Sequence, residues 1–159
     1  MARRATSASD AAWTAAWQEL DGVGCIGMRL RQAMRLATQR LDQALKPAGI
    51  AITQFAPMAY LYRDGGLSMG ELAELVGVDP TTLTRILRPL EKRGLLRQET
   101  AKDDRRRRVI ELTAQGRGAF QRALPLWHQA QGEIGALLGN TETRALRRQL
   151  DHAIARLQG

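Results

Sequence analysis

Apolar side chains recur at intervals of three and four residues through most of this chain, which is the spacing of one face of an α-helix. The first long stripe ends just before Pro47 and Gly49, two residue types that stop helices, so we expect a helix up to about Leu45. A second helix is expected over residues 52–62. The stripe positions are Ile26, Leu30, Ala33, Ala37, Leu41 and Ala44 in the first helix, then Phe120, Leu124, Trp127, Ile134, Leu138, Leu146, Leu150, Ala153 and Leu157 towards the C-terminus. This pattern predicts a mainly α chain.

Two short helices in the middle of the chain carry explicit start and stop signals. Ser68 and Glu71 have the spacing of a capping box, in which each side chain accepts a hydrogen bond from the other residue's backbone N–H. Gly77 should end this helix in the left-handed conformation that glycine adopts at little cost. Asp79 then serves as the N-cap of the next helix, with Pro80 at its first helical position. Two capped helices with so short a connection predict a helix-turn-helix.

The second of these helices, expected over residues 80–93, has one apolar and one polar face, and Gly94 follows it. The apolar face holds Leu83, Ile86, Leu87 and Leu90, and the polar face holds Thr81, Arg85, Arg88 and Lys92. Residues 95–100 and 108–112 then predict a two-stranded hairpin with a cationic tip. Thr113 should cap a long helix over residues 114–138.

These elements combine into a mainly α fold with a small β-hairpin wing, a winged helix-turn-helix with N- and C-terminal dimerisation helices. We divide it into residues 1–47 (arm and dimerisation helices), 48–113 (the winged helix-turn-helix) and 114–159 (C-terminal dimerisation helices). Residues 1–8 are expected to form a frayed arm. A short helix over residues 10–20 would place Trp13 and Trp17 on one face, packed on the body of the chain or on a partner chain.

Composition narrows the function. Lys and Arg number 24 against 16 Asp and Glu, a net charge of +8, which favours a polyanionic partner such as nucleic acid. No apolar run is long enough to span a membrane and no signal peptide is evident, which indicates a soluble, cytoplasmic protein without a membrane partner. One cysteine, Cys25, and two distant histidines, His128 and His152, match no metal-ligand spacing. We therefore expect no metal, no cofactor and no enzymatic activity, since the common nucleotide-binding and hydrolase motifs are also missing.

The polar helix face and the hairpin tip carry the chemistry of DNA recognition. Arginines on an exposed helix can read guanine in the major groove, and threonines can reach phosphates or a thymine methyl. Four adjacent arginines repel one another and become favourable beside fixed negative charge such as phosphates. The candidate DNA contacts are Ser68, Thr81, Thr82, Thr84, Arg85, Arg88, Asp104, Arg105, Arg106, Arg107 and Arg108. The alternatives are an ordinary solvated surface, and a nucleoid-type protein that binds DNA without sequence preference.

In this order, these motifs resemble the MarR (multiple antibiotic resistance) family of regulators, over nearly the whole chain from about Cys25 to Leu157. The matching stretches are Ile52-Thr-Gln-Phe55, Ser68-Met-Gly-Glu-Leu-Ala-Glu-Leu-Val76, Thr82-Leu-Thr-Arg85, Leu90-Glu-Lys-Arg-Gly-Leu95, Asp104-Arg-Arg106 and Leu112-Thr-Ala-Gln-Gly116. The resemblance implies a triangular homodimer on double-stranded DNA, with recognition helices in successive major grooves and wings in the flanking minor grooves. Arg106 matches the family's wing-tip arginine, and Asp104 matches the carboxylate that orients it.

The resemblance also implies a small aromatic or phenolic carboxylate inducer, bound between the DNA-binding lobe and the dimer region. Candidate lining residues are Arg29, Tyr60, Trp127 and His128, although an aromatic ring at helical spacing is more often part of a core. Peroxide sensors of the family carry a reactive cysteine near the start of the long N-terminal helix. Cys25 falls slightly before that position, so we expect a buried, inert thiol, and a redox sensor is the alternative.

Overall fold

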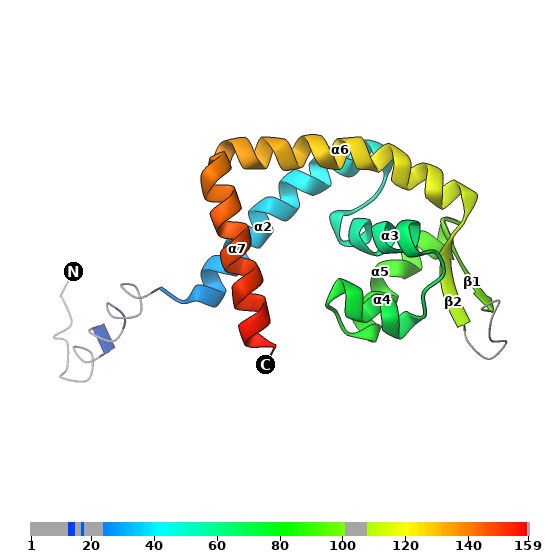
Figure 1. The fold of residues 1–159 in the computed structure, drawn as a ribbon, viewed down its shortest axis with the longest axis horizontal. Helices are drawn as coiled ribbons and strands as arrows, with labels where there is room; N and C mark the ends of the chain where they lie inside the picture. Colours follow the sequence, from blue (N-terminus) through cyan, green and yellow to red (C-terminus); the bar gives the residue numbers. More distant parts are fainter. Residues whose placement is uncertain (1–12, 15–16, 18–23, 101–107, 159) are drawn as a thin grey trace, which may run out of the picture. The chain divides into compact units, whose positions relative to one another are not determined.

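The computed structural model describes residues 13, 14, 17, 24–100 and 108–158. The chain divides into two compact units, Met1–Thr38 and Gln39–Gly159, and helix α2 runs across the boundary between them. Figure 1 shows the elements in chain order. They are α2 (Ile26–Leu45), a 3-10 turn η1 (Lys46–Ala48), α3 (Ile52–Asp64), α4 (Met69–Val76), α5 (Pro80–Lys92), β1 (Leu96–Thr100), β2 (Arg108–Leu112), α6 (Ala114–Leu138) and α7 (Asn140–Leu157). The mainly α fold with a hairpin wing is confirmed.

The start and stop signals of α4 act as the sequence predicts. The Ser68 backbone N–H donates to Glu71 Oε2 at 2.7 Å, and the Glu71 N–H donates to Ser68 Oγ at 3.3 Å. Gly77 closes the helix with φ of 76° and ψ of 36°, in the left-handed region. The connection between α4 and α5 is therefore fixed at both ends, which sets the direction in which α5 leaves the turn.

A single core joins α3, α4, α5, the hairpin and the first half of α6. In the second unit, Figure 1 shows α3, α4 and α5 clustered on one side of α6, with the hairpin at the N-terminal end of that helix and α7 at the other. The largest buried side chains are those of Leu45, Met58, Leu61, Leu72, Leu83, Leu87, Leu90 and Leu95. The same core includes Leu96, Ile110 and Leu112 of the hairpin and Ala119, Phe120 and Ala123 of α6. The elements from α3 to β2 and the first half of α6, here called the winged lobe, therefore share one core and position their exposed side chains as one body.

The hairpin pairs β1 and β2 in antiparallel register, with Leu96 opposite Leu112 and Thr100 opposite Arg108. A short third segment, which the sequence did not predict, extends this sheet. The Leu67 N–H donates to the Ile110 carbonyl at 3.2 Å, and the Ile110 N–H donates back at 2.7 Å. This bridge ties the base of the wing to the residue that immediately precedes the α4 cap.

Helix α6 begins at its predicted cap, since Thr113 Oγ1 accepts the Gly116 N–H at 3.0 Å. Its predicted buried face is partly wrong. Phe120 is buried as expected, but Leu124, Trp127 and Ile134 are only half-buried and Leu138 is 49% exposed. The fully buried positions are mostly small, namely Gly116, Ala119, Phe120, Ala123, Ala130 and Gly135. Small residues allow the backbone of α6 to approach the lobe closely, which hydrophobic periodicity alone does not reveal.

Several apolar faces have no cover among the residues that the structure describes. Helix α7 buries none of its residues, and Leu157 at its end is 85% exposed. In the first unit, Ile26 of α2 is 74% exposed. Trp13 and Trp17, also in the first unit, are 66% and 64% exposed. Among the helices within residues 24–100 and 108–158, none combines the length and the apolarity needed to cross a bilayer.

Gly116 lies where α6 meets the end of α5. A Cβ atom at this position would overlap the Leu95 carbonyl oxygen and lie 2.9 Å from its carbon. The Leu95 carbonyl cannot move aside freely, because it accepts the Thr113 backbone N–H at 3.0 Å. Gly118 lies two residues further along the same helix. A Cβ atom there would have only the flexible end of the Arg122 side chain near it, at 3.5 Å.

We expect Gly116→Ala to lower the free energy of unfolding by about 1–3 kcal/mol, because the new methyl group must displace backbone. The matched variant Gly118→Ala should instead raise it by about 0.5–1 kcal/mol, because alanine loses less conformational entropy in a helix. Urea unfolding at one fixed protein concentration measures both values. Equal stability of the two variants would contradict a rigid junction at Leu95.

Candidate nucleic-acid interface

Helix α5 presents the predicted two faces. Leu83, Leu87 and Leu90 are buried, while Ile86 is half-buried. The residues of the opposite face are all exposed, namely Thr81, Thr84, Arg85, Arg88 and Lys92. The helix therefore displays threonine and arginine side chains to solvent from a backbone that its apolar face holds against the core. This is the arrangement that a helix needs to enter a major groove and reach base edges.

A hydrogen-bonded network occupies the N-terminus of α5. Asp79 accepts the Thr82 backbone N–H at 2.9 Å and the Thr82 hydroxyl at 2.6 Å, so it is the predicted N-cap. Arg85 Nη2 in turn donates to Thr82 Oγ1 at 3.4 Å. These contacts hold the pKa of the Asp79 carboxyl below its usual value, chiefly through the Thr82 hydroxyl and backbone N–H. The cap is thus a carboxylate at the positive end of the helix dipole.

Thr84, on the exposed face, is hydrogen-bonded to its own helix. Thr84 Oγ1 donates to the Pro80 carbonyl oxygen at 2.8 Å, one turn earlier. Ser68, predicted as a DNA contact, is half-buried and its hydroxyl accepts the Glu71 N–H of the α4 cap. Both hydroxyls keep lone pairs for a further donor, but their present bonds serve helix geometry.

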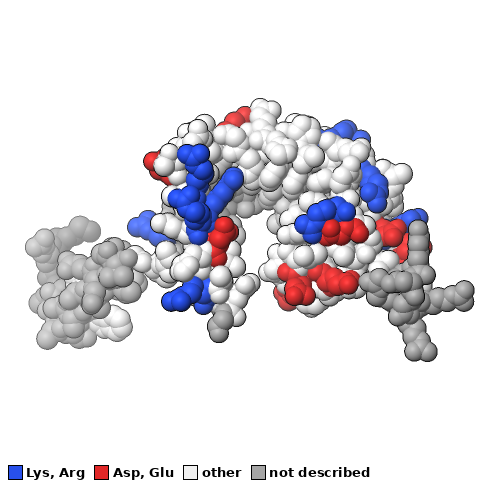
Figure 2. Space-filling model, viewed as in Figure 1, with Lys and Arg blue, Asp and Glu red and all other residues white. Residues whose placement is uncertain are grey.

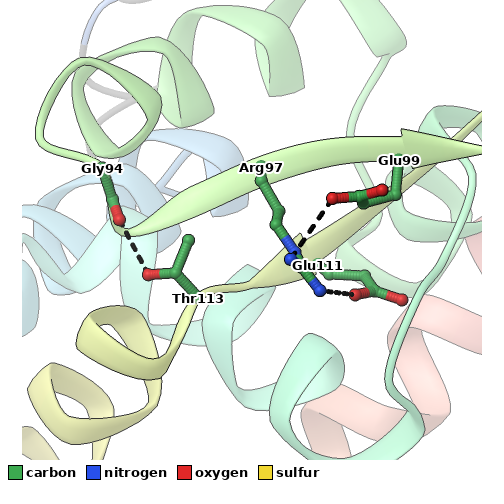
Figure 3. Close-up of polar contacts among 5 residues, drawn as sticks. All are labelled: Gly94, Arg97, Glu99, Glu111 and Thr113. Atoms are coloured by element: carbon green, nitrogen blue, oxygen red, sulfur yellow. Dashed lines mark hydrogen bonds and ion pairs between the residues drawn. The ribbon is translucent and has the colours of Figure 1, made fainter.

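An ion-pair cluster that sequence reasoning missed lies on the strands of the wing. Figure 3 shows Arg97 between two carboxylates. Arg97 Nη1 lies 3.3 Å from Glu99 Oε1, and Nη2 lies 3.0 Å from Glu111 Oε2. Arg97 and Glu111 face each other directly across the hairpin, so strand register could have identified the pair. The same view shows Thr113 Oγ1 donating to the Gly94 carbonyl at 2.7 Å, where the hairpin joins α6.

The tip of the wing contains four of the predicted contacts, Asp104, Arg105, Arg106 and Arg107, which lie outside the described residues. Arg108, the first residue of β2, is exposed. Because Arg97 is paired with carboxylates, the strands themselves add little positive charge to this side of the lobe. Figure 2 shows acidic as well as basic side chains on the face of the lobe in view. Positive charge is therefore local rather than uniform.

Three of the four predicted ligand residues lie in the second unit. Trp127 stacks on Phe55 with ring centroids 5.1 Å apart, and Tyr60 packs partly on the core beneath the Arg63 guanidinium. His128 is exposed and meets the edge of the Trp127 ring. Arg29 belongs to the first unit. The packing interpretation of the two aromatic residues is thus the one that their contacts support.

Cys25 is exposed, so the expectation of a buried thiol is wrong for this chain. It immediately precedes α2, whose first turns lack an apolar cover in the structure. Within the described residues, no group of three or more His, Cys, Asp or Glu side chains is arranged to hold a metal ion.

Comparison with known proteins identifies the architecture. The model of the MarR family matches residues 50–107. The crystal structure of the M. tuberculosis transcriptional regulator MosR is 37% identical, with a TM-score of 0.72, over 84% of this chain and 96% of that one. The chain belongs to the MarR family. Members of this family are transcriptional regulators, so this MarR-family protein is a DNA-binding regulator and not an enzyme.

Further relatives extend the comparison. The M. tuberculosis regulator MosR in complex with DNA is 38% identical, with a TM-score of 0.68, over 83% of this chain and 98% of that one. An HTH-type transcriptional repressor of Mycobacterium tuberculosis is 28% identical over 126 residues, 79% of this chain and 91% of that protein. The structure of NadR in complex with 4-hydroxyphenylacetate is 26% identical, with a TM-score of 0.63, over 82% of this chain and 92% of that one.

The Asp79 cap gives the regulator a pH-dependent contribution to stability. A carboxyl whose pKa is lowered by folding stabilises the folded state above its unfolded pKa, and this contribution is lost as pH falls through the folded pKa. We expect Asp79→Asn to unfold at a lower temperature than the parent near neutral pH, and the difference to shrink below about pH 4. Thermal unfolding of both proteins between about pH 3 and pH 7, an interval that covers the usual pKa of a carboxyl group, measures this difference in unfolding temperature.

Asp151→Asn is the matched control, because Asp151 lies in the middle of α7 rather than at a helix N-terminus. A difference between parent and Asp79→Asn that stayed constant with pH would show that the charge of the cap contributes nothing.

Proposed function

We propose that this MarR-family protein is a sequence-specific, ligand-responsive repressor that acts as a homodimer on a pseudo-palindromic operator. The observation that carries the proposal is the exposed Thr and Arg face of α5, held by a capped N-terminus at 2.6–2.9 Å and a buried leucine face. Support comes from the DNA complex of MosR and from the relative that is named a repressor. Residues 48–113 form the DNA-binding part in this proposal.

Base recognition is assigned to α5 and backbone contact to the wing. Arg85 and Arg88 would approach base edges in the major groove, with Thr81 and Thr84 beside them. Arg106, oriented by Asp104, would enter the minor groove, and its arginine neighbours would contact phosphates. The candidate contacts remain Ser68, Thr81, Thr82, Thr84, Arg85, Arg88, Asp104, Arg105, Arg106, Arg107 and Arg108.

Dimerisation is assigned to residues 1–47 and 114–159. Apolar side chains of α7 are exposed in the described part of the chain: Leu146 is 42% exposed, Ile154 54% and Leu157 85%. A contiguous apolar face of this kind on a helix is typical of a protein interface. A two-fold dimer would carry two α5 helices to half-sites about one helical turn of DNA apart, roughly 34 Å.

Ligand response is proposed through a change in the separation of the two DNA-binding lobes. NadR, a relative with 4-hydroxyphenylacetate bound, supports a small aromatic carboxylate as the class of inducer. Arg29 and His128 are the candidates that could meet a carboxylate, and Tyr60 and Trp127 those that could meet a ring. For Trp127 this requires its outer surface, since one side of the indole stacks on Phe55.

Arg85 and Arg106 have different roles in the proposed DNA complex. We expect Arg85→Ala to cost about 1–3 kcal/mol per half-site on the preferred duplex and to relax base preference there. Arg106→Ala should weaken all sequences more evenly and reduce the slope of log affinity against log salt by about one unit per lost phosphate contact. The preferred duplex is first selected by the parent protein from a random-sequence pool.

Binding to the preferred duplex, a half-site mismatch and random DNA at several salt concentrations measures both effects. Arg122→Ala, an exposed arginine on α6, is the control for loss of net charge. If Arg106→Ala changed base preference while Arg85→Ala changed only the salt slope, the assignment of helix and wing would be reversed. If the parent lost its preference against random DNA at physiological salt, the nucleoid-type function would replace this one.

The apolar face of α7 is the proposed dimer interface. Leu157→Glu should shift the protein towards monomer and weaken operator binding, because it places a charge on the apolar face of α7 without disturbing a buried residue. Ala155→Glu, on the opposite side of the same helix, should remain dimeric. Light scattering across a dilution series gives the assembly state, and unchanged dimerisation of Leu157→Glu would contradict the proposed interface.

A further inference from the structure

Thr82 connects the cap of the recognition helix to the arginine that we assign to base reading. Its hydroxyl oxygen lies 2.6 Å from Asp79 Oδ2 and 3.4 Å from Arg85 Nη2. A hydroxyl has one hydrogen to donate and lone pairs to accept with. A carboxylate can only accept, and a guanidinium can only donate. The direction of both bonds is therefore determined: Thr82 donates to Asp79 and accepts from Arg85.

The rest of the network keeps Thr82 in this orientation. Its backbone N–H donates to the other carboxylate oxygen of Asp79 at 2.9 Å, so the residue is held at two points. It is also half-buried, unlike Thr81 and Arg85 beside it. Arg85, by contrast, is exposed, and a long exposed side chain samples many rotamers unless a neighbour restricts it.

We propose that Thr82 is a positioning residue for sequence recognition, which fixes the Arg85 guanidinium above the first turn of α5 through a hydrogen-bond chain anchored at Asp79. The inference deepens the proposed function, on which it rests. Thr82 itself need not touch a base. A guanidinium oriented before binding loses less freedom when it pairs with a base edge, and it presents its donors in a set direction. Discrimination between base pairs, more than affinity for phosphates, depends on that direction.

Thr84 provides a matched control within the same helix. Like Thr82, it is a threonine with a hydrogen-bonded hydroxyl, but it donates to the Pro80 carbonyl of its own helix. Replacement of either residue by valine keeps the β-branched shape and removes the hydroxyl. Each change removes a hydroxyl that donates a hydrogen bond near the N-terminus of α5, but only at position 82 does it also remove the acceptor of an arginine.

The experiment measures discrimination, defined as the ratio of affinities for the duplex selected by the parent and for duplexes with one base pair changed. We expect Thr82→Val to reduce this ratio by about tenfold while random DNA and the salt slope stay close to the parent. Thr82→Ser should restore the ratio, because serine keeps both the donor and the acceptor. Thr84→Val removes a candidate DNA contact but leaves the acceptor of Arg85 in place, so any loss of discrimination that it causes should persist when Arg85 is also replaced by alanine. Thermal unfolding confirms that each variant is folded.

A double-mutant cycle with Arg85→Ala tests whether Thr82 acts through the arginine. Thr82→Val should have no further effect on discrimination when Arg85 is already replaced. The positioning role would be overturned if Thr82→Val had its full effect on discrimination in the Arg85→Ala background. It would also be overturned if Thr82→Val lowered the affinity for every duplex equally. If Arg85→Ala reduces discrimination and Thr82→Val does not, the inference fails and the proposed function stands. If Arg85→Ala has no effect, both fail together.

Discussion

The winged lobe depends on the contact between the end of α5, the start of the hairpin and the first turn of α6. The Leu95 carbonyl accepts the Thr113 backbone N–H, and the Thr113 hydroxyl donates to the Gly94 carbonyl. The Leu95 backbone also lies so close to Gly116 that any side chain at position 116 would overlap it. Helix α5, the hairpin and helix α6 therefore meet within these few residues. The recognition helix, the wing and the helix that leads to α7 therefore hold a defined arrangement, because a shift of any one breaks hydrogen bonds or creates a clash.

This junction explains how a lobe with few polar contacts in its core can present polar side chains accurately. Nearly all buried side chains are apolar, and no buried side-chain nitrogen or oxygen of the described residues lacks a hydrogen-bond partner. The polar bonds lie instead at element ends, at Ser68, Asp79 and Thr113. Each fixes where a helix begins, and hence the rotation at which its exposed residues face solvent. In the proposed function, recognition is set by caps as much as by contact residues.

Most of this architecture could be predicted from the sequence, because its signals are local. Capping residues, the left-handed Gly77 and the two faces of α5 each depend on residues within a turn or two. Features that depend on distant residues were missed. The Leu67 bridge to Ile110 involves residues 43 positions apart, a separation no periodicity reports. The small residues of α6 are explained by the close approach of the Leu95 backbone, which is distant in sequence from most of that helix. The exposure of Cys25 likewise depends on packing that its sequence neighbours do not determine.

The same distinction between local and distant effects bears on assembly. The apolar residues of α7 recur at helical spacing, and this local pattern is enough to predict the helix. It does not show what the exposed apolar side chains pack against. A helix in this state gains its stability from tertiary or quaternary packing rather than from propensity. If a second copy supplies that packing, as we propose, the stability of α7 and the spacing of the recognition helices are properties of the dimer. A ligand that alters the packing around α6 and α7 would then change operator affinity without touching α5, since both half-sites must be matched at once.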